Sequence, residues 1–525
     1  MLEEAFATLA NSTQTLVNGT QVFVERLSTF ELVLLVLTVS SLLFVIGFTW
    51  SLAASCPKIP YGPKWQPFLG STVEFIRNFD RIDDWIYDGT KKYGEFKHAW
   101  GASLLTVGQF KGGMLVLVTP EEVKHVLKDN FENYEKGALV HDNFQEFFGD
   151  GIFASDGAAW KFHRKVAANM FSTKLLIEGT EVAIDQAKKM MSLLDQKATR
   201  GEAIDLQPVF YAFTMDTFCS IAFGVELDSQ TKPHAFAKAF DVVQELSARR
   251  FQVPFWKIGR LLQTKAEREL KQHVAIIDNF AKTIIEGRRR TLNDKGSKLG
   301  VDLVTRFLQR AEQNNEKIDT KTLRDIVLNF IIAGRDTTAA ALTWAIYELS
   351  RAPQAIAVIR NELAKFVPSG TSILDLPKDE VFNILSRGMV ETKSVVLEVL
   401  RLHPSVSIDI KTSIKADTLP SGIHVPATCG VVYSPYAMGR NPELWRDPLK
   451  FDHTRFMQLA AKTEKDGSRA KSPRRLSVYR PTPVSDYKYP GRACHLSLLL
   501  LLLAPSPERV SLPFLFFVNS MCLLL

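Results

Sequence analysis

Cysteine is scarce and scattered in this sequence, and no Cys-x-x-Cys pair occurs among the five residues: Cys56, Cys219, Cys429, Cys494 and Cys522. This spacing argues against a disulfide scaffold and against a structural zinc site. Long blocks of one charge are also lacking, because Lys and Arg (64) exceed Asp and Glu (57) by only seven. Nucleic acid is therefore not an expected partner. No strand is followed by a Gly-x-Gly-x-x-Gly loop, so we expect no nucleotide-binding domain.

One long uncharged run lies near the N-terminus, at residues 32–54. At about 1.5 Å per residue it is long enough to cross a hydrocarbon core of about 30 Å, so it predicts one membrane anchor. The alternative, a buried core helix, seldom stays uncharged for so long. Acidic residues precede the run, and Lys58 and Lys64 follow it, which places residues 1–31 in the lumen and the rest in the cytosol.

A stiff hinge and one large domain follow the anchor. Residues 55–70 contain four prolines and two glycines, which prevent the anchor helix from continuing. Residues 71–456 have even composition, which favours one domain, mainly α with small β-sheets (α+β). Apolar periodicity predicts helices at about residues 181–195, 232–248, 262–290, 322–350 and 383–402. Short strand signals lie near residues 97–118 and 413–432.

A step of small and polar residues interrupts the apolar 322–350 helix. Ala333-Gly334 leaves a gap in which something bulky can lie against the backbone, and Asp336 and Thr337 stand beside it. Thr337 can bond back into its own helix, and Asp336 can relay protons from solvent. Taken alone, the step also fits an ordinary buried helix with a polar turn.

Two further patterns place charged or hydrogen-bonding groups at helical spacing. Glu398 and Arg401 lie one helical turn apart and can pair, and Arg455 can complete a three-member ionic cluster. Trp160 and Arg164 lie four residues apart, so an indole N–H and a guanidinium can hold carboxylates of a ligand. Each pattern alone is common in surface salt bridges or in packing.

Together and in this order, the patterns resemble the cytochrome P450 family of haem-thiolate monooxygenases over residues 57–456. The resemblance implies that Trp160 and Arg164 contact haem propionates and that Asp336 and Thr337 deliver protons for oxygen activation. It also implies that Glu398, Arg401 and Arg455 form a structural triad behind the haem. His453 and Thr454 depart from the Pro-Glu pair that is usual beside that triad.

The resemblance also implies cofactors, partners and location. The cofactor would be haem b with its iron, molecular oxygen the co-substrate, and a separate NADPH-dependent membrane reductase the source of electrons. The anchor and hinge resemble those of endoplasmic-reticulum members, so the chain would be a single-pass protein of that membrane with its catalytic domain in the cytosol. A narrower resemblance to the fatty-acid omega-hydroxylase branch implies a long-chain fatty acid or similar lipophilic substrate. It rests on residues 250–257, 302–307, 333–338, 419–426 and 436–440.

The resemblance stops near Phe456, where the family pattern continues towards a Phe-x-x-Gly-x-Arg-x-Cys-x-Gly loop. The nearest remnant keeps Arg492, implied to assist haem binding, and Cys494, implied to be the axial ligand of the haem iron. Pro490 and Leu496 replace the two glycines whose flexibility lets the loop turn beneath the haem. The sequence therefore predicts that the chain binds haem poorly or not at all.

Residues 457–525 form a tail of aberrant, partly low-complexity composition. A frame slip or a retained intron in the coding sequence would explain the abrupt change of composition after the last family motif. Two hypotheses remain open at this point. One is a haem-dependent monooxygenase acting on a lipid, and the other is a haem-free, P450-like membrane protein without catalysis.

Overall fold

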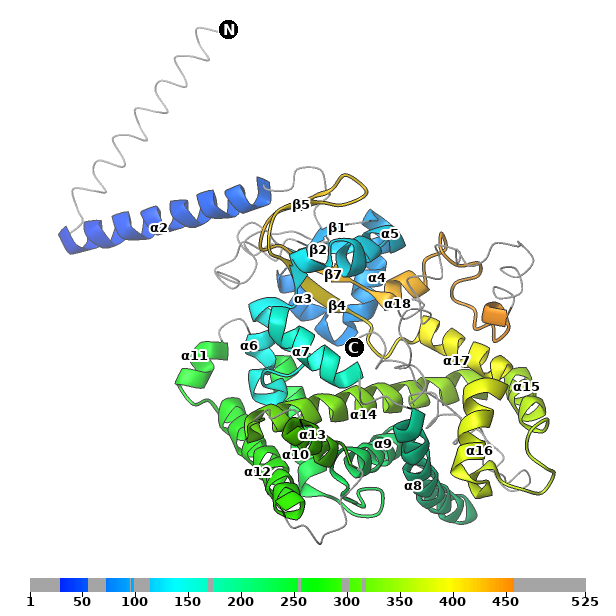
Figure 1. Ribbon diagram of the computed structural model, residues 1–525. Helices are drawn as coiled ribbons and strands as arrows, with labels where there is room; N and C mark the ends of the chain where they lie inside the picture. Colours follow the sequence, from blue (N-terminus) through cyan, green and yellow to red (C-terminus); the bar gives the residue numbers. More distant parts are fainter. Residues whose placement is uncertain are drawn as a thin grey trace.

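The computed structural model describes residues 29–54, 72–94, 96–98, 114–168, 173–253, 256–293, 302–313 and 318–457. In Figure 1 the strands gather at one end of a body that consists mostly of helices. The expected class, mainly α with small sheets, is confirmed for these residues. The predictions for the hinge, for Arg492 and Cys494, and for the tail beyond residue 457 lie outside the described residues.

The five stretches that the sequence predicts to be helical all form helices. They correspond to α8 (Thr173–Thr199), α10 (Ala235–Arg249), α12 (Lys265–Asn293), α14 (Thr320–Ser350) and α17 (Val390–Leu402). The last prediction began too early, because α16 (Lys378–Asn383) and the π-turn η5 (Ile384–Gly388) precede α17. Periodicity does not distinguish one long helix from two helices whose apolar faces are in phase.

The other helices are shorter or lack a polar face. Among them α9 (Leu206–Phe223) was not predicted, because nine of its residues are buried and little periodic contrast remains. The remaining α-helices of the body are α3 (Thr72–Arg77), α4 (Ile82–Tyr93), α5 (Pro120–Lys124), α6 (Gly137–Phe148), α7 (Gly157–Ala168), α11 (Trp256–Leu261), α13 (Leu303–Gln313), α15 (Pro353–Leu363) and α18 (Pro435–Gly439). Single turns are η1 (Phe79–Arg81), η2 (His125–Asp129), η3 (Phe131–Asn133) and η4 (Ile373–Asp375).

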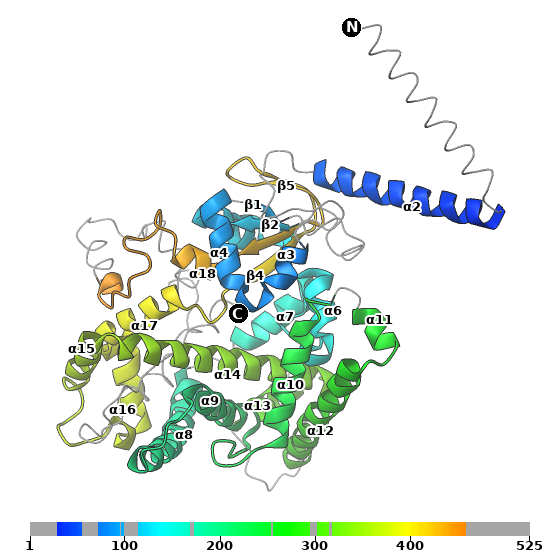
Figure 2. The ribbon, with the colours of Figure 1, turned by 180° about the vertical axis from the view of Figure 1, so that it is seen from behind.

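Helix α14 runs through the middle of the body in both views (Figures 1 and 2). Asp319 caps its start by accepting a hydrogen bond of 2.6 Å from the backbone N–H of Thr322. The helix ends shortly before Pro353, because a residue that precedes proline is disfavoured in the helical conformation. Most of its length is buried against neighbouring helices, so its side chains are held by packing on several sides.

The strand signals correspond to short strands in two sheets. The five-stranded sheet has the order β1 (Phe96–His98), β2 (Met114–Leu117), β7 (Gly430–Tyr433), β4 (Asp409–Ser413) and β3 (Tyr134–Glu135). Only β2 and β7 are parallel, and the other pairs are antiparallel. A separate two-stranded sheet pairs β5 (Asp417–Thr418) with β6 (His424–Val425).

The two central strands bury both faces of the larger sheet. In β2, Leu115 and Leu117 belong to one apolar cluster, whereas Met114 and Val116 belong to another. Successive side chains of a strand point to opposite faces, so a continuous apolar run indicates that both faces are covered. Packing on both faces therefore holds the central strands of the sheet in place.

Helix α2 (Thr29–Ala54) projects away from the body (Figure 2). Its described side chains, at residues 33–47, are mostly exposed and apolar, and Phe44 is 73% exposed. The described residues include no helix that is long and apolar enough to cross a membrane. The anchor at residues 32–54 stays a prediction.

A buried arginine connects several helices of the body. Arg250 directly follows α10, and its side chain is 3% exposed. It donates to Glu146 of α6 and to Glu267 of α12, each at 2.7 Å, and its guanidinium lies 4.1 Å from the ring centre of Trp256 in α11. One side chain thus fixes the relative positions of α6, α11 and α12.

Replacing this arginine should destabilise the fold. We expect Arg250→Met to lower the free energy of unfolding by about 3 kcal/mol, because a buried charge pair that loses one partner leaves the other uncompensated. Denaturant midpoints of the full chain measure the effect. Lys365→Met is the control, because Lys365 and its partner Glu391 have side chains that are 58% and 30% exposed. Equal shifts for the two variants would contradict the assignment.

Candidate functional site

The predicted hydroxyl of α14 is bonded back into its own helix. Thr337 Oγ1 donates to the carbonyl of Ala333 at 2.5 Å, and α14 continues unbroken through this bond. The carbonyl of Thr337 also accepts a hydrogen bond of 2.9 Å from Ser405 Oγ, just after α17. A hydroxyl whose proton is engaged in this way keeps its lone pairs as acceptors. Thr337 is therefore held in one orientation with its acceptor sites retained.

The gap at Gly334 is occupied by a neighbouring helix. A Cβ atom built on Gly334 would lie 2.0 Å from the ring of Phe218, which belongs to α9. The bulky group that the sequence led us to expect beside this backbone is thus a side chain of the protein at Gly334. Glycine here serves the close packing of α9 on α14.

Asp336 is held by an ion pair within its own helix. Its Oδ1 accepts from Arg335 Nη1 at 2.9 Å, and its side chain is 14% exposed. Burial raises the pKa of the Asp336 carboxyl, and the Arg335 guanidinium opposes that effect. Its Oδ2 is buried and has no hydrogen-bond partner in the described part of the chain. This oxygen can accept or pass on a proton without first breaking a hydrogen bond.

Trp160 and Arg164 both lie on α7, one turn apart and partly buried. The ring of Trp160 lies 5.1 Å from that of Phe131, centre to centre. The ammonium of Lys136 lies 5.7 Å from the centre of the Trp160 ring. The structure thus adds a basic group to the predicted pair.

A second lysine lies beside Lys136, across the sheet edge. The register of β3 and β4 pairs Glu135 with Thr412, so the next residues along the two strands, Lys136 and Lys411, come opposite each other. Both side chains are 14% exposed. Burial and the charge of Lys411 lower the pKa of Lys136 to about 8, although the carboxylates of Asp156 and Asp409 partly oppose this. An anion placed between the two amines would stabilise both charges.

Sequence reasoning missed this pair. No motif marks either lysine, and they are 275 positions apart in the chain (411 minus 136). The only signal is the pairing of two strands, and β3 has just two residues. Such a strand is too short to predict from alternation.

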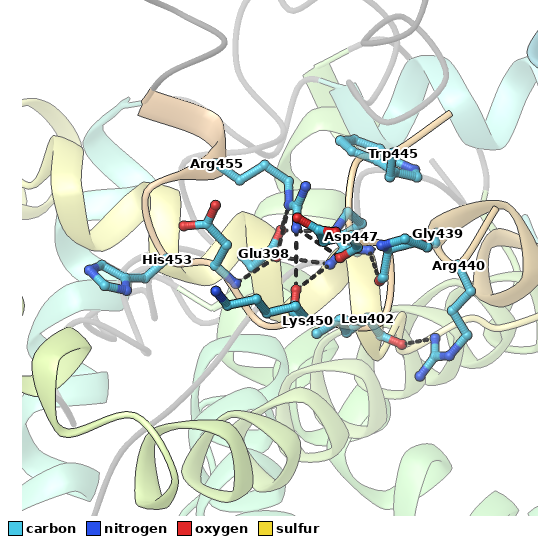
Figure 3. A network of polar contacts seen from close by, with 12 residues as sticks. Glu398, Leu402, Gly439, Arg440, Trp445, Asp447, Lys450, His453 and Arg455 are labelled. Atoms are coloured by element: carbon cyan, nitrogen blue, oxygen red, sulfur yellow. Dashed lines mark hydrogen bonds and ion pairs between the residues drawn. The ribbon is translucent and has the colours of Figure 1, made fainter. Parts of the chain in front are cut away.

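The structure brings Glu398, Arg401 and Arg455 together in one buried cluster (Figure 3). Arg401 donates to both carboxylate oxygens of Glu398 at 2.8 Å, and Arg455 Nε lies 3.0 Å from each of them. Glu398 and Arg401 are completely buried, and Arg455 is 8% exposed. One carboxylate thus lies between two guanidinium groups.

The remaining donors of the two arginines bind backbone carbonyls of the segment after α18. Arg401 donates to the carbonyls of Gly439, Pro448 and Lys450, and Arg455 donates to those of Arg446 and Asp447. The cluster is intact although His453 and Thr454 replace the Pro-Glu pair that is usual beside it. The His453 carbonyl accepts a hydrogen bond of 2.8 Å from Ser394 Oγ of α17. The cluster therefore fixes residues 439–455 against α17.

The described residues contain no group of three or more His, Cys, Asp or Glu side chains that could hold a metal ion. Arg492 and Cys494 lie outside the described residues. A surface groove of about 680 Å³ lies between α8 and η4, and Lys188, Met191, Asp195 and Asp375 are among its lining residues. None of the predicted site residues lines it.

The order of these features along the chain matches a known family. The model of the family described as Cytochrome P450 matches residues 60–470. The chain belongs to the cytochrome P450 family. This membership confirms the resemblance found in the sequence. By family the protein is a monooxygenase, an oxidoreductase of a family that uses haem iron, molecular oxygen and electrons supplied by a reductase.

Curated relatives cover most of the chain. Cytochrome P450 94A1 of Vicia sativa is 33% identical, and the match covers 73% of this chain and 72% of the relative. Cytochrome P450 704B1 of Arabidopsis thaliana is 31% identical over 76% of this chain and 81% of its own. Cytochrome P450 monooxygenase cyp1 of Mycosarcoma maydis is 31% identical over 78% of this P450 and 64% of its own length.

The buried cluster predicts a strong effect for a nearly isosteric change. Glu398→Gln should lower the free energy of unfolding of this P450 by about 3–5 kcal/mol, because two buried guanidinium groups lose their shared counter-charge. Limited proteolysis should then cut first within residues 439–457. Glu391→Gln is the matched control, at a carboxylate that is 30% exposed and pairs with Lys365. Unchanged midpoints and cleavage in Glu398→Gln would show that the carbonyl acceptors alone hold the segment.

Proposed function

We propose that this P450 is a membrane-anchored, haem-dependent monooxygenase that inserts one oxygen atom into a lipid-like substrate, a long-chain fatty acid. The pair of buried amines at Lys136 and Lys411 beside Trp160 carries the proposal. Within the described residues the side chains of Lys136 and Lys411 are each 14% exposed, and their carboxylate neighbours Asp156 and Asp409 lie at 3.8 Å and 3.5 Å. An anion placed between the two amines would add a closer counter-charge to both. The carboxylates of haem are anions of the required kind.

The residues present fit the carboxylate edge of haem. Lys136 and Lys411 would hold its carboxylates by charge-assisted hydrogen bonds, and Trp160 and Arg164 would add an indole N–H and a guanidinium. Arg492 would assist from the loop that carries Cys494, whose thiolate we propose as the iron ligand. When bound, haem supplies the iron that activates molecular oxygen.

The α14 residues would supply and hold protons beside the cofactor. Thr337 Oγ1 donates its hydrogen bond to the Ala333 carbonyl, so its lone pairs can accept a hydrogen bond from a water molecule and orient it. Asp336 lies one residue earlier, and its Oδ2 can receive a proton and release it. Together the two side chains form a short path for protons from the α10 side of the helix to the Thr337 hydroxyl.

The substrate class and the electron donor rest on the sequence. The motifs shared with the fatty-acid omega-hydroxylase branch support a lipid substrate. Two residues of one such motif, Arg250 and Trp256, have structural roles here, so that motif does not by itself point to substrate contact. A separate NADPH-dependent reductase would supply electrons, because the sequence has no nucleotide-binding loop.

Carbon monoxide spectra of the full chain test the haem proposal. With excess haem and reductant, we expect a thiolate-type Soret band that disappears in Cys494→Ser. The band should be weak, because Pro490 has no N–H and cannot adopt positive φ. The double variant Pro490→Gly/Leu496→Gly should strengthen it. Absence of the band in both chains would favour the haem-free hypothesis instead.

A second arm of the same measurement tests the basic pair. Haem titration of Lys136→Gln/Lys411→Gln should show affinity reduced about tenfold or more, since a hydrogen bond to a charged group contributes about 1.5–3 kcal/mol. Lys188→Gln/Lys189→Gln is the matched double control, on α8. If the control weakens haem binding equally, the amines do not hold the carboxylates.

Membrane attachment is proposed through residues 32–54, supported by the exposed apolar side chains of α2. Deleting residues 1–56 should move the protein from membranes to soluble or loosely peripheral fractions, because only surface contacts would remain. Carbonate washing of membranes, followed by detection of the chain in pellet and supernatant, measures this. Retention of the truncated chain in washed membranes would show that another segment anchors the protein.

A further inference from the structure

Arg335 on α14 is shared by two carboxylates from different helices. Its Nη1 donates to Asp336 Oδ1 at 2.9 Å on the same helix, and its Nη2 donates to Asp241 Oδ1 on α10. The Arg335 side chain is 4% exposed, whereas that of Asp241 is 58% exposed. A surface carboxylate is thus linked through one buried cation to the carboxylate beside Thr337.

Aromatic rings fix the plane of this guanidinium. Its central carbon lies 4.8 Å from the ring centre of Tyr211 on α9 and 5.3 Å from that of Phe240 on α10. Such contacts stabilise a cation and restrict its movement to small shifts between its two acceptors. Three helices therefore meet at Arg335.

The cluster has unused hydrogen-bonding capacity. Arg335 Nε and Asp336 Oδ2 are both buried without a hydrogen-bond partner in the described part of the chain. Buried polar atoms are usually paired, so these two atoms in contacting residues can each form a further hydrogen bond when a partner approaches.

The charge on Asp336 depends on how Arg335 is shared. The groups that face Asp336 are Arg335 on its own helix, Asp241 and Gln244 on α10, and Tyr211 on α9. Burial raises the pKa of Asp336, Arg335 lowers it most, the nearby Gln244 amide also lowers it, and Asp241 raises it. Burial, with a contribution from Asp336, also raises the pKa of Tyr211 to about 12, so Tyr211 stays neutral.

We propose that Arg335 is a positioning residue that Asp241 and Asp336 share, so that the position of α10 sets the protonation of Asp336. When α10 holds Arg335 through Asp241, the cation is drawn from Asp336, which takes up a proton more readily. When that contact is lost, Arg335 pairs with Asp336 alone and keeps it ionised. The link couples α10 to the proton path, and its role in oxygen chemistry rests on the proposed function.

Infrared titration of the full chain tests the coupling without haem. With 13C-labelled aspartate, the protonated carboxyl band of Asp336 is the one that is missing in Asp336→Asn. In Asp241→Asn this band should appear about one pH unit or more lower than in the unmodified chain, because Arg335 then serves Asp336 alone. In Arg335→Gln the band should appear at higher pH, and Arg335→Lys should restore most of the original titration.

Glu245→Gln is the matched control. Glu245 lies on α10 next to Gln244, is 60% exposed and pairs with Arg249, so its replacement should leave the Asp336 titration unchanged. An unshifted band in Asp241→Asn, or an equal shift in Glu245→Gln, would overturn the proposal. Because Asp241 is largely exposed, its variant decides the question even if Arg335→Gln does not fold. Failure of haem binding with the expected titration would count against the proposed function alone.

Discussion

Glu398 is a single buried carboxylate that lies between two guanidinium groups, and the attachment of residues 439–455 to α17 depends on it. Two buried cations at contact distance would repel each other strongly without a shared counter-charge. The carboxylate removes that repulsion, and the remaining N–H groups then bind backbone carbonyls of residues 439–450. A segment without regular secondary structure is thereby fixed against α17, although few of its own backbone groups bond to one another.

Helix α14 distributes neighbouring residues among different surroundings. Successive residues of an α-helix are rotated by about 100°, so adjacent side chains leave the helix in different directions. Gly334 packs against the Phe218 ring of α9, Arg335 reaches Asp241 of α10, and Thr337 turns its hydroxyl back to Ala333. A few consecutive positions thus combine close packing, an interhelical ion pair and a held hydroxyl.

Sequence reasoning succeeded where the signal is local. The pairing of Glu398 with Arg401 follows from helical spacing, and amphipathic helices such as α12 follow from periodicity. Sequence reasoning failed at α9, where burial on most sides removes the contrast between an apolar and a polar face. It also failed where the two partners of a contact are distant in the chain. Lys136 meets Lys411 only because two short strands pair, and Arg335 meets Asp241 only because α10 packs near α14. Sequence spacing alone cannot predict contacts between residues so far apart in the chain.

The buried charges of this P450 fall into two groups that differ in how completely they are paired. Glu398 and its two arginines have charge partners and carbonyl acceptors, as a cluster that only maintains structure requires. Lys136 and Lys411 instead repel each other and have carboxylates only at 3.8 Å and 3.5 Å, and Arg335 and Asp336 each keep a buried atom without a hydrogen bond in the described part of the chain. Incomplete pairing costs folding free energy, so it persists where a ligand or a proton completes it. We therefore propose the under-paired groups, rather than the most buried ones, as the places where this P450 would bind its cofactor and move its protons.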